Sequence, residues 1–165
     1  MENYRWLAGL IAAHPDRKVF GRTRIQKEVK LLQGLGFGTD YSYTIHFYGP
    51  YSEGLYSDIG LLAAAGLIKE TSATTAEGNP YYILEASREA ELPPIERFRD
   101  KIDKLAKAQP VDLELAATYD AFRDAGADHK EALFRLRRKK GSKCDDGNLE
   151  EALRLLEDLG LETEQ

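Results

Sequence analysis

Apolar residues recur every three or four positions through most of the chain, which is the spacing of helices that bury one face. The first such segment covers residues 4–14 and stops at Pro15, because proline cannot continue a helix. A second covers residues 23–33. A third begins at Ser52, a residue type that caps helix N-termini, and ends at Gly66, where a left-handed cap is expected. The first 66 residues are therefore predicted to hold three helices.

Aromatic and β-branched residues predict three strands. Residues 41–48 form the longest such run, and we expect the Gly-Pro pair at 49–50 to end it. Residues 67–71 and 81–84 flank a polar stretch with a Gly-Asn-Pro turn, so they are predicted to form a β-hairpin. Three helices and then a hairpin is the order of a winged helix-turn-helix, although the strand at 41–48 interrupts that order here.

The second half of the chain is predicted to be helical. A pair of prolines at 93–94 starts one helix, which Pro110 ends. Helical spacing continues through residues 113–125, 129–140 and 149–159.

The composition changes near residue 90, and we divide the chain there. Residues 1–90 are predicted to form a winged-helix-like domain with a small β-hairpin. Residues 91–165 form a helical region, which either shares one core with the first domain or packs separately. The predicted fold class is α+β and mainly helical.

Composition places the chain among ordinary soluble globular proteins. It has 165 residues, of which 42% are hydrophobic and 31% charged, so a core can form without disulfides. The single cysteine excludes a disulfide framework and a cysteine-based zinc site. Because no apolar run reaches membrane-spanning length and no cleavage pattern follows the N-terminus, we expect a cytoplasmic protein with no membrane partner.

The charge is unevenly distributed. The net charge is −5, which argues against a generally basic nucleic-acid binder. Nevertheless, the first fifty residues hold seven Lys or Arg against four Asp or Glu, and a second basic cluster covers residues 135–143. Each cluster either contacts phosphates or forms a solvated face. The predicted third helix has no Lys, Arg, Asn or Gln but carries Glu53 and Asp58, which disfavours its insertion into a major groove.

Six of the chain's aromatic residues lie between positions 41 and 56. Such rings combine a large apolar area with polar tips, which suits a core edge, a partner-docking surface or base stacking. His46 lies within this segment and is interpreted as a structural histidine that could pair with Asp58 or Glu53. The six rings are Tyr41, Tyr43, Phe47, Tyr48, Tyr51 and Tyr56.

The candidate catalytic residues do not form a recognisable set. His14, His46 and His129 lack metal-ligand spacing, and Cys144 lies in a polar loop without an evident catalytic base. The glycine-rich run at 34–38 follows a helix rather than a strand, unlike a phosphate loop. We therefore expect no catalytic residue, no metal and no cofactor. An enzyme built on His46 and a carboxylate would need a closed pocket that holds the two together.

Two motifs carry a family resemblance. The segments RTRIQK at 22–27 and HFYGPYSEGL at 46–55 resemble the YwgA-like uncharacterised prokaryotic proteins and, more distantly, the Panacea (SocA-like) antitoxin domains. The resemblance covers most of the chain, but the YwgA-like group implies no particular activity. Panacea domains are similar to antitoxins that bind toxin proteins or deliver them to proteases, and their motif would map to Gln26-Lys27 and Gly49-Pro50.

These observations support two hypotheses. The first is a non-enzymatic cytoplasmic regulatory or protein-interaction module, with an unidentified protein partner bound at Tyr43, His46, Tyr48, Tyr51 and Glu53. The alternative is a nucleic-acid-binding transcriptional regulator, for which a homodimer is compatible. Its contacts, or contacts to an acidic partner, would come from Arg22, Arg24, Lys27, Arg137, Arg138 and Lys139.

Overall fold

The structure is a computed structural model that describes residues 3–87, 95–161 and 163. Seven α-helices and five strands occur in this part of the chain, with short 3-10 turns between some of them. The helices are α1 (Asn3–Ala13), α2 (Arg22–Gln33), α3 (Glu53–Ala64), α4 (Arg99–Lys107), α5 (Pro110–Asp124), α6 (His129–Lys140) and α7 (Asn148–Leu159). The strands are β1 (Lys18–Phe20), β2 (Thr44–His46), β3 (Gly49–Tyr51), β4 (Ile68–Thr74) and β5 (Pro80–Ala86).

The α+β, mainly helical class is confirmed, and most helix ends follow the expected signals. The Ser52 hydroxyl accepts a hydrogen bond from the Leu55 amide and so caps α3. Gly66 has a φ of +77° just beyond the end of α3, as its type predicts. The helix expected from the prolines at 93–94 falls partly outside the described residues. Its described part begins as a 3-10 turn at Glu96–Phe98 and continues as α4.

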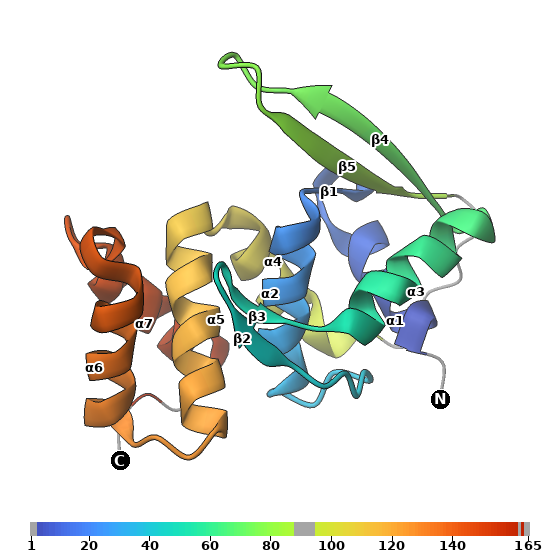
Figure 1. Ribbon diagram of the computed structural model, residues 1–165. Coiled ribbons are helices and arrows are strands. Elements are labelled where there is room, and N and C mark those ends of the chain that lie inside the picture. Colours follow the sequence, from blue (N-terminus) through green and yellow to red (C-terminus); the bar gives the residue numbers. More distant parts are fainter. Residues whose placement is uncertain (1–2, 88–94, 162, 164–165) are drawn as a thin grey trace.

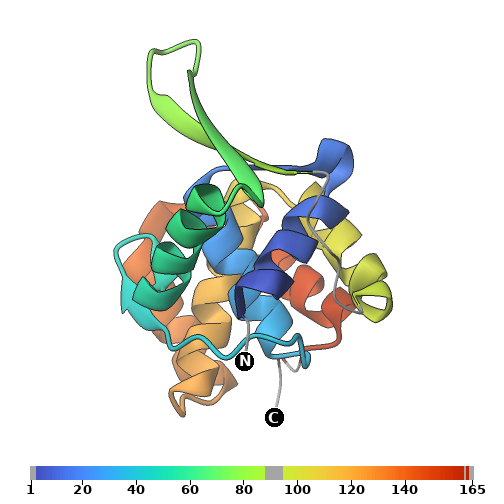
Figure 2. The ribbon, with the colours of Figure 1, turned by 90° about the vertical axis from the view of Figure 1, so that its right-hand side faces the viewer.

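The long hairpin is also confirmed, and it has an additional strand. β4 and β5 pair along seven residues each and extend away from the helical body (Figures 1 and 2). β1 pairs antiparallel with β5 and gives the strand order β1-β5-β4. Three residues are too few to show a strand period, so β1 could not be recognised from its sequence.

The strand expected at 41–48 is wrong over much of its length. The observed β2 covers only residues 44–46, and the Gly-Pro pair at 49–50 belongs to its partner strand β3. Before β2, the side chain of Gln33 donates to the Tyr41 carbonyl at 2.8 Å and accepts from its amide at 3.0 Å. Because this side chain satisfies both backbone groups of Tyr41, the backbone there has no need of a strand partner.

One continuous buried core joins residues from both halves of the chain. α2 lies between α5 on one side and α1 and α3 on the other (Figure 1), and it packs directly against α5. Near the other end of the core, Trp6, Phe37 and Phe98 form edge-to-face ring pairs with centroids 4.8–6.2 Å apart. The expected boundary near residue 90 lies outside the described residues.

A buried ionic network connects α1, α2 and α4. His14 Nδ1 donates to the Leu10 carbonyl at 2.8 Å, and its Nε2 lies 2.7 Å from a carboxylate oxygen of Glu28. The other Glu28 oxygen accepts from Arg24 at 3.1 Å, and Arg24 also donates to three carbonyls at the end of α4. Burial lowers the pKa of His14, but the hydrogen bond and negative charge of Glu28 outweigh this and raise it above 6.5.

This network predicts a defined pH dependence of stability. Because the folded pKa of His14 is raised, its protonation stabilises the fold fully below about pH 6.5, and this contribution is lost as pH rises through the raised value. The free energy of unfolding, measured in urea between pH 5.5 and 9, is expected to fall with rising pH.

The Glu28→Gln variant is expected to lose about 3–5 kcal/mol at pH 6, because one partner of a buried ion pair is removed. Its slope above pH 6.5 is expected to flatten. Glu77→Gln, at an exposed glutamate of the hairpin turn, is the control and should match the original protein. Equal slopes for Glu28→Gln and the original protein would contradict the assignment of the slope to this network.

Candidate functional site

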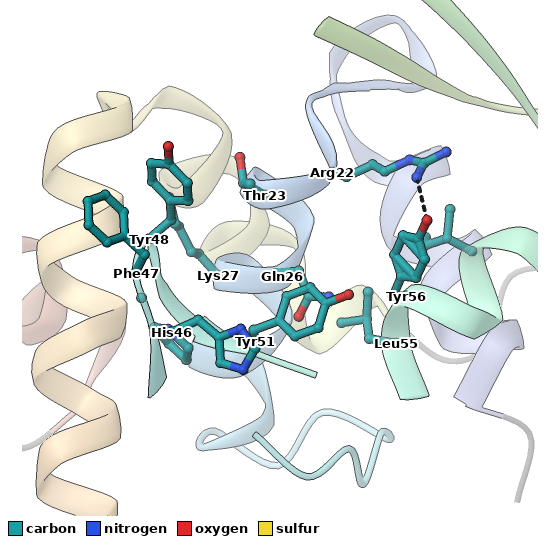
Figure 3. A pocket seen from close by; sticks show the side chains of 13 residues that line it. Arg22, Thr23, Gln26, Lys27, His46, Phe47, Tyr48, Tyr51, Leu55 and Tyr56 are labelled. Atoms are coloured by element: carbon teal, nitrogen blue, oxygen red, sulfur yellow. Dashed lines mark hydrogen bonds between the residues drawn. The ribbon is translucent and has the colours of Figure 1, made fainter. Parts of the chain in front are cut away.

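A pocket lies between α2, α3 and the β2–β3 hairpin (Figure 3). Its volume is about 330 Å³, which is at the small end of the range of roughly 300–1,000 Å³ for ligand sites. We call it the α2–α3 pocket. Its lining residues are Arg22, Thr23, Gln26, Lys27, His46, Phe47, Tyr48, Gly49, Pro50, Tyr51, Leu55, Tyr56 and Ile59.

Aromatic rings form most of the outer wall of this pocket. The hairpin turn presents Phe47 and Tyr48, whose residues are 78% and 59% exposed. His46 and Tyr51 stack on each other with ring centroids 4.9 Å apart and planes at 21°. The Tyr56 ring, on α3, lies 6.4 Å from that of Tyr51 (Figure 3). The rings therefore line the opening from the hairpin to α3.

The position of the hairpin and of α3 is fixed by close polar contacts. The Gln26 side chain accepts from the Ser52 amide at 2.8 Å and donates to its carbonyl at 3.0 Å, so it ties the start of α3 to α2. Gly49 has a φ of +109°, and a Cβ at this position would lie 2.9 Å from Thr118 Oγ1 on α5. A glycine is therefore required where the hairpin crosses α5.

Arg22 braces the rim of the pocket. Its guanidinium donates to both carboxylate oxygens of Glu70, each at 2.5 Å, and to the Tyr56 hydroxyl at 3.3 Å. It also lies over the rings of Tyr82 and Tyr56, at 4.5 and 5.3 Å from their centroids. Arg22 thus joins α2 to α3 and to the β4–β5 hairpin, and Glu70 neutralises its charge.

Three lysines surround one glutamate behind the hairpin. Glu114, on α5, lies 3.7 Å from the ammonium of Lys27, 2.8 Å from that of Lys140 and 3.0 Å from that of Lys143. The group has an excess of two positive charges. Burial lowers the pKa of Lys27, and the charges of Lys140 and Lys143 add to this against the attraction of Glu114. The lysines together outweigh burial at Glu114 and lower the pKa of its carboxyl.

The structure brings together only some of the residues singled out from sequence. His46 stacks on Tyr51 rather than pairing with Asp58, whose carboxylate accepts a hydrogen bond from Tyr41. The pocket contains Arg22, Lys27, His46, Tyr48 and Tyr51.

The other candidates lie elsewhere. Arg24 is occupied by Glu28 and the end of α4, which favours a structural role. Tyr43 is half-buried with its ring 5.9 Å from the Lys30 ammonium, outside the pocket, and Glu53 is exposed on α3. The remaining three, Arg137, Arg138 and Lys139, are exposed on α6.

Sequence reasoning missed several residues of the site. Thr23 and Gln26 line it from α2, and Glu70 and Glu114 balance its cations. One signal was available for Glu114, which is a lone carboxylate between two leucines of a predicted helix. A charged residue in an apolar run is rarely buried without a partner.

The fold and the site together define a class: a small α+β protein with a preformed, aromatic-walled pocket. The chain is similar to the uncharacterised protein YwgA of Bacillus subtilis (strain 168), with 27% identity over 153 residues that cover 86% of this chain and 88% of that protein. This similarity supports the YwgA-like resemblance, and it does not extend to the Panacea domains. No family model and no solved structure matches the chain. Within the described residues, no helix combines the length and apolar character needed to span a membrane.

Gly49 provides a test of the pocket's construction. Gly49→Ala is expected to destabilise the protein by about 1–3 kcal/mol, because it combines a strained positive φ with a contact to Thr118. Gly60→Ala is the matched control, since Gly60 lies within α3 and a Cβ added there would meet nothing within 4 Å. That variant is expected to gain about 0.5–1 kcal/mol. Thermal or urea unfolding of both variants measures the difference, and equal stabilities would refute the close approach.

Proposed function

We propose that the protein is a non-enzymatic regulatory module that binds a partner protein through the aromatic rim of the α2–α3 pocket. The observation that carries this proposal is the exposure of Phe47 and Tyr48 on a hairpin whose backbone is rigidly held. Large rings on a fixed turn lose little conformational entropy on binding and are typical anchors of protein interfaces. The pocket beside them offers a concave surface for a partner's side chain.

The proposed scaffold is winged-helix-like. The order α1, α2, α3 and then the β4–β5 hairpin supports this interpretation, and β2–β3 is an insertion between α2 and α3. In a winged helix that reads DNA, the third helix presents basic or amide side chains. Here α3 presents the exposed Glu53, Tyr56 and Leu61 instead. This surface favours contact with protein over contact with phosphates.

The chemistry of the pocket also favours binding over catalysis. Its one histidine stacks on Tyr51, and the nearest carboxylates, Glu70 and Glu114, already accept from arginine or lysine. A general base needs a free lone pair directed at the substrate. We place the module in the cytoplasm because its one cysteine suits a reducing compartment.

Photo-crosslinking tests the proposed interface. A benzoylphenylalanine at position 47 is expected to crosslink a discrete partner protein in cells of the native host. Tyr48→Ala and Tyr51→Ala should each reduce recovery of that partner by about tenfold, because interface rings often dominate binding. Tyr81→Ala removes a tyrosine outside the pocket and should leave recovery unchanged. Crosslinks that are equal in all three variants, or the absence of any partner, would count against the proposal.

A second candidate function rests on α6. Arg137, Arg138 and Lys139 are exposed, and they remain the basic cluster best placed to meet a nucleic acid. If they bind phosphates, affinity for duplex DNA should fall steeply with salt, and replacing all three by glutamine should reduce the slope of log affinity against log salt by about 0.9 per lost contact. Lys107→Gln, on α4, is the control. Fluorescence anisotropy without binding at low salt would eliminate this candidate.

A further inference from the structure

We propose that the interior of the α2–α3 pocket binds a small molecule in which a planar ring is joined to a phosphate monoester, as in a nucleoside monophosphate. This goes beyond the partner-binding function, because it assigns the pocket an effector rather than a side chain of the partner. Three features of the pocket carry the inference: a buried cation, an unbalanced charge and a set of stacking surfaces.

The cation is Lys27, whose side chain lines the pocket and is only 10% exposed. Thr23 lies one turn earlier on α2 and lines the same pocket (Figure 3), so a hydroxyl donor and an ammonium face one region. Both belong to the first two turns of a twelve-residue helix. The N-cap, Gly21, provides no side-chain hydrogen bond, and the first turn has no acidic residue. The positive end of the helix dipole therefore adds to the attraction for an anion.

The charge balance selects the kind of anion. Lys27, Lys140 and Lys143 share one carboxylate, that of Glu114, which leaves two positive charges uncompensated. Arg22 does not change this balance, because Glu70 neutralises it. A phosphate monoester carries a charge of about −1.5 to −2 at neutral pH, whereas a carboxylate carries one. The phosphate is therefore the closer match to the excess.

The walls select the rest of the ligand. The stacked pair of His46 and Tyr51 presents ring faces to the pocket, and Leu55 and Ile59 line it with apolar side chains. Aromatic faces bind nucleobases by stacking, with little dependence on base identity. The pocket is also preformed, since Gln26 fixes α3 to α2 by two hydrogen bonds to Ser52. A ligand of mononucleotide size suits a cavity of about 330 Å³.

Isothermal titration calorimetry of the full chain at low salt tests the proposal. The probes are AMP, UMP, adenosine, inorganic phosphate and a single-stranded oligonucleotide without terminal phosphates. AMP and UMP are expected to bind one per chain. Adenosine and inorganic phosphate should each bind at least roughly tenfold more weakly than AMP, since each lacks one of the two recognised groups.

Variants connect binding to the pocket. Lys27→Met should weaken AMP binding at least roughly tenfold, and Lys27→Arg should retain most of it, which separates loss of charge from loss of fold. Lys27→Met leaves Glu114 with two lysine partners, so the fold should persist. Tyr51→Ala should weaken binding roughly five- to a hundredfold through loss of one stacking face. Lys139→Met and Tyr81→Ala are matched controls outside the pocket and should bind AMP normally.

Several results would overturn the proposal: no saturable binding of either nucleotide at millimolar concentration, equal affinity for adenosine and AMP, or normal AMP binding by Lys27→Met. Binding of the oligonucleotide without binding of AMP or UMP would also overturn it and would point to a nucleic-acid strand instead. The crosslinking experiment is performed without added nucleotide. A partner that depends on Tyr48 would thus support the interaction module even if every nucleotide failed to bind.

Discussion

The charged residues of α2 are held by other elements, and this constraint shapes the whole molecule. Along this one helix, arginines and lysines reach the β4–β5 hairpin, the end of α4 and two positions on α5. The one acid, Glu28, pairs with His14 on the other side. Buried charges are costly unless they are paired, so each contact fixes the position of an element relative to α2. The pairs are Arg22–Glu70, Arg24–Glu28, Lys27–Glu114 and Lys30 with Asp120 and Asp124.

This arrangement changes the meaning of the basic N-terminal segment. Its positive charge suggests a surface for phosphates when the chain is considered alone, but in the structure most of the α2 cations face other parts of the same chain. Lys30, for example, lies 2.6 Å from Asp120 and 2.5 Å from Asp124. A cation that already has two carboxylate partners attracts an external anion weakly. Only Lys27 combines a shared partner with a place in the pocket wall.

The helical part of the fold could be predicted because its signals are local. Helical spacing, Ser52 and Gly66 indicate α3 within one stretch of chain, and the structure confirms both ends. The segment before β2 could not be predicted in the same way, because Gln33 satisfies the backbone of Tyr41 by a contact that spacing does not reveal. Periodicity reports which face is buried, and it does not report which polar group satisfies a backbone.

The site was predictable in its aromatic half and not in its ionic half. A dense run of tyrosines is visible in the sequence, and its rings do gather at the pocket. The pairing of Lys27 with Glu114, in contrast, joins residues 87 positions apart and depends on the packing of α2 against α5. The same contact connects the pocket to the rest of the molecule. Lys140, which shares Glu114, also donates to the Phe47 carbonyl at 3.0 Å and so holds the hairpin turn against α6.

An anion beside Lys27 would compete with Glu114 for that ammonium and leave Glu114 more fully to Lys140 and Lys143. The contacts of the hairpin turn and those of the pocket interior therefore share one set of charges. Any ligand that alters this set must change the free energy of partner binding at Phe47 and Tyr48 by the same amount as the partner changes that of the ligand. The geometry thus makes the interior of the pocket and its rim thermodynamically linked rather than independent.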